Sequence, residues 1–408
     1  MRTSSTRMGR GQAVLSAVLG MLLVGIAAGP AHADSIRSQQ WHLDAMGAEE
    51  IWEISTGQGV KVAVIDSGVN ATNPDLMGQV LKGKDLAPKE AGDEHTDYHG
   101  HGTSMAGLIA GTGESGGGDG AFGLAPGAKI LPIRIPDSGW DINRSSKIKE
   151  YNRAASDGIR YATDEGAKVI NMSQKVLEGS PELTAAVKYA LDKGSLVFAG
   201  SGNDGDNSQG YPASTPGVVG VGALGKDLKK TEESQWGPQV DVSAPGEEMV
   251  HACNGKTGLC KSHGTSDATA IASATAALIW SKHPEWTNNQ VLRVMLNTIS
   301  APTSGNKRND YIGYGAVRPL RALKTPGDPG PADVFPLPDL AAAEPKSPSP
   351  EASEPVDSSE SGTDDKPASA ASAADGSSNT GLWIGLGVAA AALIGAAIAI
   401  SVTRSRRS

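Results

Sequence analysis

Four residues that lie far apart in the chain have side chains that together could attack a carbonyl group. They are Asp66 in VIDSG, His101 in YHGHGTS, Asn203 in GSGNDG and Ser266 in HGTSDATA. A histidine can take the proton of a serine hydroxyl near neutral pH, and a carboxylate can hold the imidazole in the required tautomer. A side-chain amide can donate to the oxygen that becomes negative during the attack. The set therefore predicts acyl transfer through Ser266.

Three of these residues also have a simpler structural interpretation. Ser266 precedes a long apolar run, where serine is a favoured helix cap. Asp66 lies two residues before a glycine, as in an Asx turn, and Asn203 begins an Asn-Asp-Gly sequence typical of tight turns. The chemical interpretation is favoured because the other members of the set are present in the same chain.

A metal site is the other interpretation of the histidines. His99 and His101 are two residues apart and could bind a metal from one strand face, but no third ligand with suitable spacing is evident. We therefore expect no metal and no other cofactor at this site. Whether the fold binds structural calcium stays open.

The elements that must position these residues alternate between strand and helix. Short apolar, β-branched runs predict strands at 60–65, 128–135, 167–172, 195–199 and 218–221. Longer patterns with helical spacing predict helices at 104–111, 145–165 and 181–193. This order indicates an α/β fold with a central, mostly parallel sheet and helices on both faces, with functional loops at the carboxyl ends of the strands.

Six segments resemble the subtilisin-like serine peptidases in order and approximate spacing, over nearly all of residues 40–300. They read VAVIDSGVNATNPDL, HGHGTSMAGLIAG, GLAPGAKILPIRI, VINMS, GSGNDG and HGTSDATA. The resemblance implies a subtilisin-like fold and a serine endopeptidase with the triad Asp66, His101 and Ser266. It also implies that Asn203 is the oxyanion asparagine.

The resemblance extends to a smaller group, the mycosins, which are membrane-bound subtilases associated with type VII secretion in actinobacteria. The stretch WHLDAMGAEEIWEISTGQGVKVAVIDSG, the cysteine pair and the anchored tail are most similar to this group. It implies a peptide or protein substrate, and it suggests the secretion machinery as a partner. It also implies that Ser173, Gln174 and Lys175 bind an extended substrate as a β-strand.

The chain departs from the family pattern beside the serine and in this substrate-binding segment. Asp267 and Ala270 replace the usual apolar residue and proline, and they favour an alternative function as a binding component of a secretion complex with little turnover. A carboxylate at residue 267 suits a helix start; we hypothesise that it also stabilises the imidazolium of His101 and shifts activity to higher pH. Gln174 and Lys175 replace Leu-Gly, which predicts a narrow-specificity processing protease. Lys175 could select an acidic substrate residue, but a solvated surface lysine is the favoured interpretation.

Both ends of the chain carry targeting signals. Residues 1–33 combine early arginines with an apolar stretch and the sequence AHA, as in an export signal cut after Ala33. Residues 381–402 are 22 residues without a charge, enough for a transmembrane helix, and the basic tail 403–408 favours the cytoplasmic side. We expect a single-pass protein of the cell membrane with its peptidase domain, 34–323, outside the cell. The Pro-, Ser- and acid-rich region 324–380 is expected to be a disordered stalk.

Charge and cysteine content narrow the remaining possibilities. The formal net charge is −9 and no Lys/Arg cluster occurs in the middle of the chain, which excludes a nucleic-acid partner. The two cysteines, Cys253 and Cys260, are expected to form a disulfide in an oxidising compartment. A reactive thiol or half of a zinc site lacks supporting residues.

Overall fold

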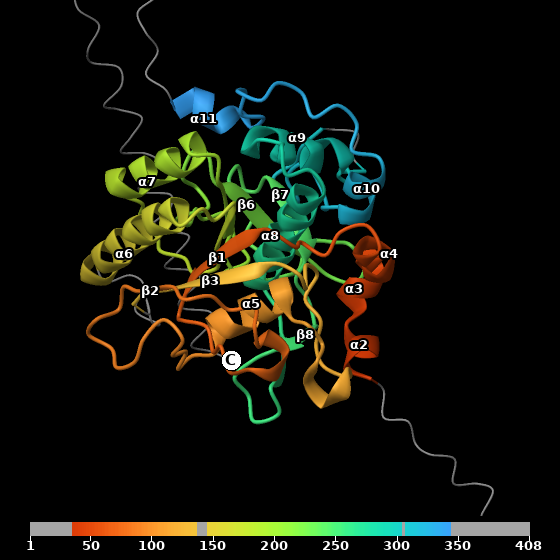
Figure 1. Ribbon diagram of the computed structural model, residues 1–408. Coiled ribbons are helices and arrows are strands. Elements are labelled where there is room, and N and C mark those ends of the chain that lie inside the picture. Colours follow the sequence, from red (N-terminus) through yellow and green to blue (C-terminus); the bar gives the residue numbers. More distant parts are fainter. Residues whose placement is uncertain (1–34, 137–144, 304–306, 344–408) are drawn as a thin grey trace, which may run out of the picture. The chain divides into compact units, whose positions relative to one another are not determined.

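The computed structural model describes residues 35–136, 145–303 and 307–343 (Figure 1). A seven-stranded sheet forms the centre of this part of the chain, and every neighbouring pair of strands is parallel. In spatial order its strands are β2 (Lys84–Asp85), β3 (Lys129–Arg134), β1 (Lys61–Asp66), β4 (Val169–Met172), β5 (Leu196–Gly200), β6 (Val219–Leu224) and β7 (Val242–Pro245). The predicted α/β fold with a mostly parallel sheet is confirmed.

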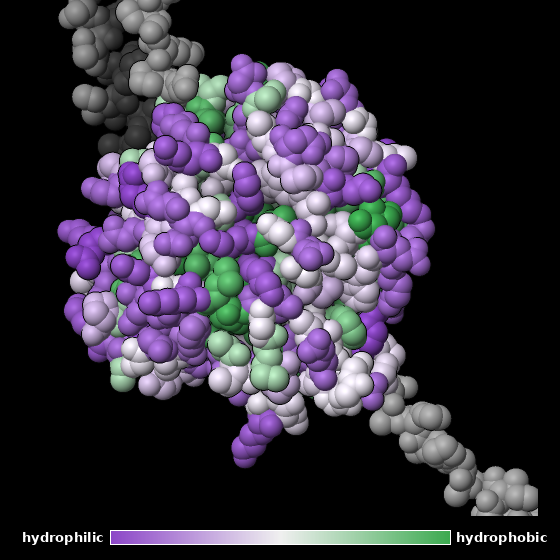
Figure 2. Space-filling view, viewed as in Figure 1, coloured by the Kyte–Doolittle hydropathy of each residue, from purple (hydrophilic) through white to green (hydrophobic). Residues whose placement is uncertain are grey.

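Helices surround this sheet. In the described ranges they are α2 (Ile36–Gln39), α3 (Trp41–Met46), α4 (Ala48–Trp52), α5 (His101–Ala110), α6 (Ser145–Asp164), α7 (Pro181–Asp192), α8 (Thr265–Lys282), α9 (Asn288–Thr298), α10 (Pro319–Lys324) and α11 (Pro338–Ala343), with 3-10 turns η1 (Pro74–Leu76) and η2 (Ser115–Gly117). The central strands are buried on both faces, which explains why they read as continuous apolar runs. On the face shown in Figure 2 hydrophilic residues predominate, and hydrophobic ones form only small separate areas.

Side-chain contacts show that α8 and α6 cover opposite faces of the sheet. On one face, Ser273 of α8 donates a hydrogen bond to Oδ1 of Asn171 at 3.0 Å. On the other, Gly158 of α6 lies against Ile65, since a Cβ atom at this glycine would lie 3.3 Å from the isoleucine. Ile65 pairs with Met172, the residue after Asn171, and successive residues of a strand point to opposite faces.

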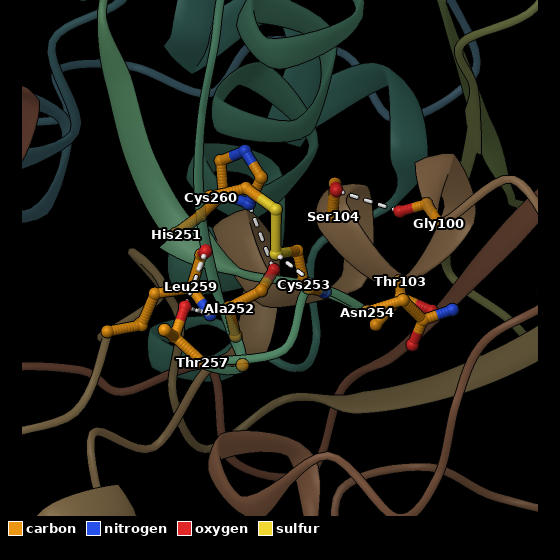
Figure 3. Close-up of a disulfide and its surroundings, with 12 residues drawn as sticks. Gly100, Thr103, Ser104, His251, Ala252, Cys253, Asn254, Thr257, Leu259 and Cys260 are labelled. Carbon is orange, nitrogen blue, oxygen red and sulfur yellow. Dashed lines mark hydrogen bonds between the residues drawn. A yellow bond between two sulfur atoms is a disulfide. The ribbon is translucent and has the colours of Figure 1, made fainter.

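A small antiparallel hairpin precedes α8. It consists of β8 (Met249–Ala252) and β9 (Leu259–Ser262), which the sequence did not predict because MVHA and LCKS are short and contain polar residues. Its connecting loop is closed by the disulfide between Cys253 and Cys260, as predicted (Figure 3). The hairpin packs on α5, where a Cβ atom at Gly107 would lie 2.6 Å from the carbonyl oxygen of Ala252.

The folded domain continues past residue 323, where the stalk was expected to begin. Leu337 is 2% exposed, and Oδ2 of Asp339 accepts a hydrogen bond from the backbone of Gly217 at 2.7 Å. Arg293 of α9 also donates to the carbonyl of Val334 at 2.7 Å. Apolar residues among the prolines of this segment therefore hold it on the domain as far as the described chain extends.

The described ranges contain no helix long and apolar enough to cross a membrane. The predicted export signal 1–33, the transmembrane segment 381–402 and the tail 403–408 lie outside the described residues. The same is true of residues 344–380 of the predicted stalk. These predictions stay predictions.

Candidate active site

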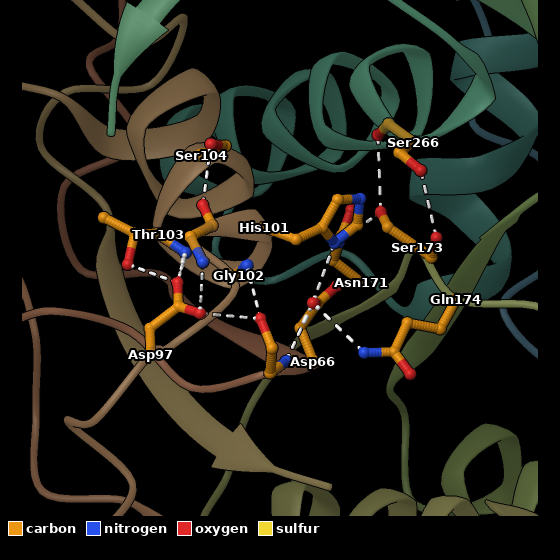
Figure 4. A network of polar contacts seen from close by, with 12 residues as sticks. Asp66, Asp97, His101, Gly102, Thr103, Ser104, Asn171, Ser173, Gln174 and Ser266 are labelled. Carbon is orange, nitrogen blue, oxygen red and sulfur yellow. Dashed lines mark hydrogen bonds and ion pairs between the residues drawn. The ribbon is translucent and has the colours of Figure 1, made fainter. Parts of the chain in front are cut away.

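Asp66 and His101 meet at the carboxyl edge of the sheet, where β1 ends and α5 begins (Figure 4). Nδ1 of His101 lies 2.8 Å from Oδ1 of Asp66, and since a carboxylate only accepts, the ring nitrogen donates. The Asp66 side chain is fully buried, whereas 37% of the His101 side chain is exposed. In the neutral imidazole, Nε2 is then the proton acceptor. Within the described ranges, no three His, Cys, Asp or Glu side chains are grouped as a metal site would require.

Asp97 fixes the position at which α5 begins. Its Oδ1 accepts from the backbone of Gly100 at 2.7 Å, and its Oδ2 accepts from the backbone and the hydroxyl of Thr103 at 2.9 and 2.6 Å. The helix therefore begins at His101, three residues earlier than predicted. Asp97 was not among the predicted site residues, although an aspartate just ahead of a helix is a known capping signal.

Gln174 contacts the buried aspartate as well. It was predicted to bind substrate, but its Nε2 donates to Oδ1 of Asp66 at 3.3 Å, and the Tyr151 hydroxyl holds its backbone carbonyl at 2.9 Å. Burial alone would raise the pKa of Asp66. The charge and hydrogen bond of His101, with further hydrogen bonds from Ser67 and Gln174, outweigh burial and hold this pKa below its usual value. Asp66 is therefore the charged partner of the imidazole.

Ser266 lies in the first turn of α8, but it is not the helix cap. The N-cap residue is Gly264, and the Ser266 hydroxyl instead donates to the carbonyl oxygen of Ser173 at 3.0 Å. In return the Ser173 hydroxyl donates to the carbonyl of Ser266 at 3.3 Å. Figure 4 shows His101, Ser173 and Ser266 gathered at one edge of the sheet. The serine and the histidine are thus held at the ends of the neighbouring strands β4 and β1, and the serine hydroxyl is directed to Ser173.

Asn203 is held beside Ser266 by the start of the same helix. Its Oδ1 accepts from both the backbone and the hydroxyl of Thr265, each at 2.9 Å. This arrangement leaves the Nδ2 protons of Asn203 as donors near the N-terminus of α8. A Cβ atom at Gly264 would lie 2.9 Å from Nδ2, and φ there is +132°, so this close approach requires glycine.

Lys175 is not the solvated surface residue that was expected. Its side chain is only 14% exposed, and its ammonium group donates to the carboxylate of Asp204 and to Oε1 of Gln235, the latter at 2.7 Å. The sequence carries no local signal for these contacts, because they join segments that are far apart in the chain.

Three carboxylates shape the electrostatics of the base. Burial disfavours the charged form of His101, but the charge and hydrogen bond of Asp66, followed by the charges of Asp267 and Asp97, outweigh burial and raise the pKa of His101 to about 9. Asp267 is itself 2% exposed and accepts a hydrogen bond from Ser262. Burial raises the pKa of Asp267, although His251, Ser262 and His101 oppose this effect.

Comparisons with known proteins agree with this geometry. The model of the Subtilase family matches residues 57–315. Thermitase from Thermoactinomyces vulgaris is 31% identical over 70% of this chain and 96% of its own length. Fervidolysin from Fervidobacterium pennivorans is 33% identical over 72% of this chain, which spans 45% of the relative's length.

The similar solved structures include two mycosins. MycP1 from Mycobacterium smegmatis superimposes with a TM-score of 0.62 and 28% identity, over 72% of this chain and 86% of that one. The MycP3 protease from the type VII (ESX-3) secretion system gives a TM-score of 0.61 and 30% identity, over 70% and 88% of the two chains.

Proposed function

The chain belongs to the subtilase family, and we propose that it is a serine endopeptidase that cleaves protein substrates through Ser266. One observation carries this proposal: the hydrogen-bonded pair of Asp66 and His101 lies at the same edge of the sheet as Ser266 and Asn203. A carboxylate, an imidazole, a hydroxyl and an amide donor from four separate segments are the parts that acyl transfer needs.

The proposed reaction has two stages. Nε2 of His101 takes the proton of Ser266 as Oγ attacks the substrate carbonyl, and Asp66 stays ionised to stabilise the imidazolium. Nδ2 of Asn203 donates to the oxygen that becomes negative. The imidazolium then protonates the leaving amine, and a water molecule activated by the same Nε2 hydrolyses the acyl-enzyme.

Substrate binding is proposed to free the nucleophile. The carbonyl of Ser173 accepts the Ser266 hydroxyl, and it belongs to the segment just after β4. An extended substrate that adds to this segment as a strand would donate a backbone N–H to the same carbonyl. The hydroxyl can then rotate toward Nε2 of His101.

We also propose that the protein is exported, held in the cell membrane by residues 381–402, and linked to type VII secretion as a narrow-specificity processing protease. The sequences of its two ends support the location. The likeness to the serine protease MycP1, an essential component of the type VII (ESX-1) secretion system, supports the link.

A fluorophosphonate probe tests the peptidase proposal directly. We expect labelling of the full chain that is lost in Ser266→Ala and strongly reduced in His101→Ala. A second candidate function, a binding component with little turnover, is favoured by the hydroxyl directed to Ser173 and the unusual Asp267. Absence of Ser266-dependent labelling would support this second candidate. If labelling does depend on Ser266, comparison of culture supernatants from wild-type and Ser266→Ala strains would identify the substrate.

A further inference from the structure

The side chain of Lys175 occupies the space between the two chain segments that flank Ser266. Residues 173–175 continue from β4 and residues 202–204 continue from β5, and these strands are neighbours in the sheet. The first segment contacts Ser266 through a backbone carbonyl, and the second carries Asn203. A substrate carbonyl held between Ser266 and Asn203 therefore directs the side chain of its own residue, P1, between these segments.

The carbon stem of Lys175 lies against two glycines at this place. A Cβ atom added at Gly210 would lie 2.4 Å from Cδ of Lys175, and one added at Gly202 would lie 2.9 Å from it. Both distances are far below the roughly 3.5–4 Å of a normal carbon contact. The stem therefore occupies the space that a side chain at Gly210 would fill. At Gly202 it shares this space with Oε1 of Gln235, which would lie 1.5 Å from the added Cβ.

Two polar groups fix the far end of the side chain. Nζ of Lys175 donates to the Asp204 carboxylate and to Oε1 of Gln235. Gln235 is fully buried, and its Nε2 is held by the carbonyl of Ser208 at 2.9 Å. A lysine with a carboxylate and an anchored amide as partners keeps its stem in one position.

We propose that Lys175 fills the P1 pocket of this enzyme, so that it cleaves after residues with small side chains such as Gly, Ala or Ser. This inference rests on the proposed peptidase function and adds its substrate class. A large P1 side chain would have to displace the stem of Lys175 and break both contacts of its ammonium group. A small one leaves them intact.

Two chromogenic peptides that differ only at P1, Ala or Phe, test the inference with the full chain. We expect the wild type to prefer Ala, and Lys175→Ala to raise the Phe-to-Ala ratio of kcat/KM by about tenfold or more, because the emptied pocket accepts the ring. Lys175→Met should keep the wild-type ratio, since its unbranched chain still fills the pocket. Lys188→Ala, at a surface lysine of α7 that is 64% exposed, is the matched control.

Three results would overturn the inference. One is a wild-type enzyme that hydrolyses both peptides equally, and another is a folded Lys175→Ala variant whose ratio is unchanged. The third is a wild-type preference for a P1 Glu peptide over Ala that Lys175→Met abolishes, because the ammonium group would then select substrates by charge.

A binding measurement separates this inference from the peptidase proposal. Labelled product peptides that end in Ala or Phe, titrated by fluorescence anisotropy against Ser266→Ala, report the pocket without turnover. If no peptide is cleaved but Lys175→Ala binds the Phe product more tightly, the peptidase proposal is refuted. The proposal that Lys175 fills the pocket is then supported. If Ser266→Ala with Lys175 intact binds both products with equal affinity, the proposal that Lys175 fills the pocket is refuted. This result does not require a Lys175 variant.

Discussion

Replacing Asp267 with Asn is expected to move the pH dependence of catalysis to lower pH. General-base catalysis needs the neutral imidazole of His101, whose pKa is raised to about 9. At pH 7 only about one imidazole in a hundred is then neutral. The kcat/KM of the wild type should therefore rise about tenfold per pH unit above pH 6 and level off near pH 9.

Asp267 contributes to this raised pKa through a charge that is coupled to His251. Nδ1 of His251 donates to the carbonyl of Ala252 at 2.9 Å, and Nε2 lies 2.7 Å from the Ser262 hydroxyl. Ser262 has one hydroxyl proton, which it donates to Asp267. A charged Asp267 is thus accompanied by a protonated Nε2 of His251, whereas a neutral His251 requires a protonated Asp267. Burial lowers the pKa of His251 and raises that of Asp267, and both effects favour the neutral pair. Asn keeps the shape and the hydrogen bond of this residue but removes its charge.

The assay is kcat/KM for an uncharged chromogenic peptide from pH 5 to pH 10, measured on the wild type and Asp267→Asn. Removing one of the three carboxylates that favour the imidazolium should increase activity at pH 7, by no more than the roughly 100-fold that full deprotonation of His101 allows. Superimposable profiles would show that no charge on Asp267 acts on His101, as for a protonated Asp267 beside a neutral His251. A wild-type inflection near pH 6.5 would refute the raised pKa itself.

Three further outcomes are expected. Asn203→Ala should lower kcat by about 100- to 1000-fold with little change in KM, measured with a good peptide substrate, because it removes the oxyanion donor. Replacing Cys253 and Cys260 together with Ser should lower the free energy of unfolding by on the order of 2 kcal/mol, measured by urea titration without reductant. Burial raises the pKa of Asp241 to about 8, against a hydrogen bond from Gly220, so its ionisation destabilises the fold as pH rises from about 4 through 8. The melting temperature of Asp241→Asn minus that of the wild type should therefore increase between pH 5 and pH 9. A difference that does not change with pH would contradict this.

The predicted strands and helices were found because their signal is local. Strands such as β1 and β4 are buried on both faces and read as apolar runs, and α6 and α7 show their helical spacing within a single segment. Short elements without such a local signal were not predicted. β8 and β9 are as short as β4 but contain polar residues and form no apolar run, and they pair with each other.

The start of α5 and the end of the folded domain depend on particular side-chain contacts, and the periodic pattern of apolar residues in the sequence does not show them. α5 begins at His101 because Asp97 satisfies its first backbone donors, and residues after 323 stay on the domain because Leu337 finds a buried position. Composition alone indicated a stalk there. A few apolar side chains were enough to outweigh it locally.

The sequence by itself determined the alternation of the longer strands and helices and indicated four side chains suited to acyl transfer, because hydrophobic periodicity and residue chemistry are properties of single segments. Only the tertiary structure decided what these side chains contact. The Ser266 hydroxyl is directed to Ser173, Gln174 donates to Asp66, and Lys175 lies between two glycines. Each contact joins segments that are far apart in the chain, and the direction of a side chain there depends on neighbours that only folding brings together.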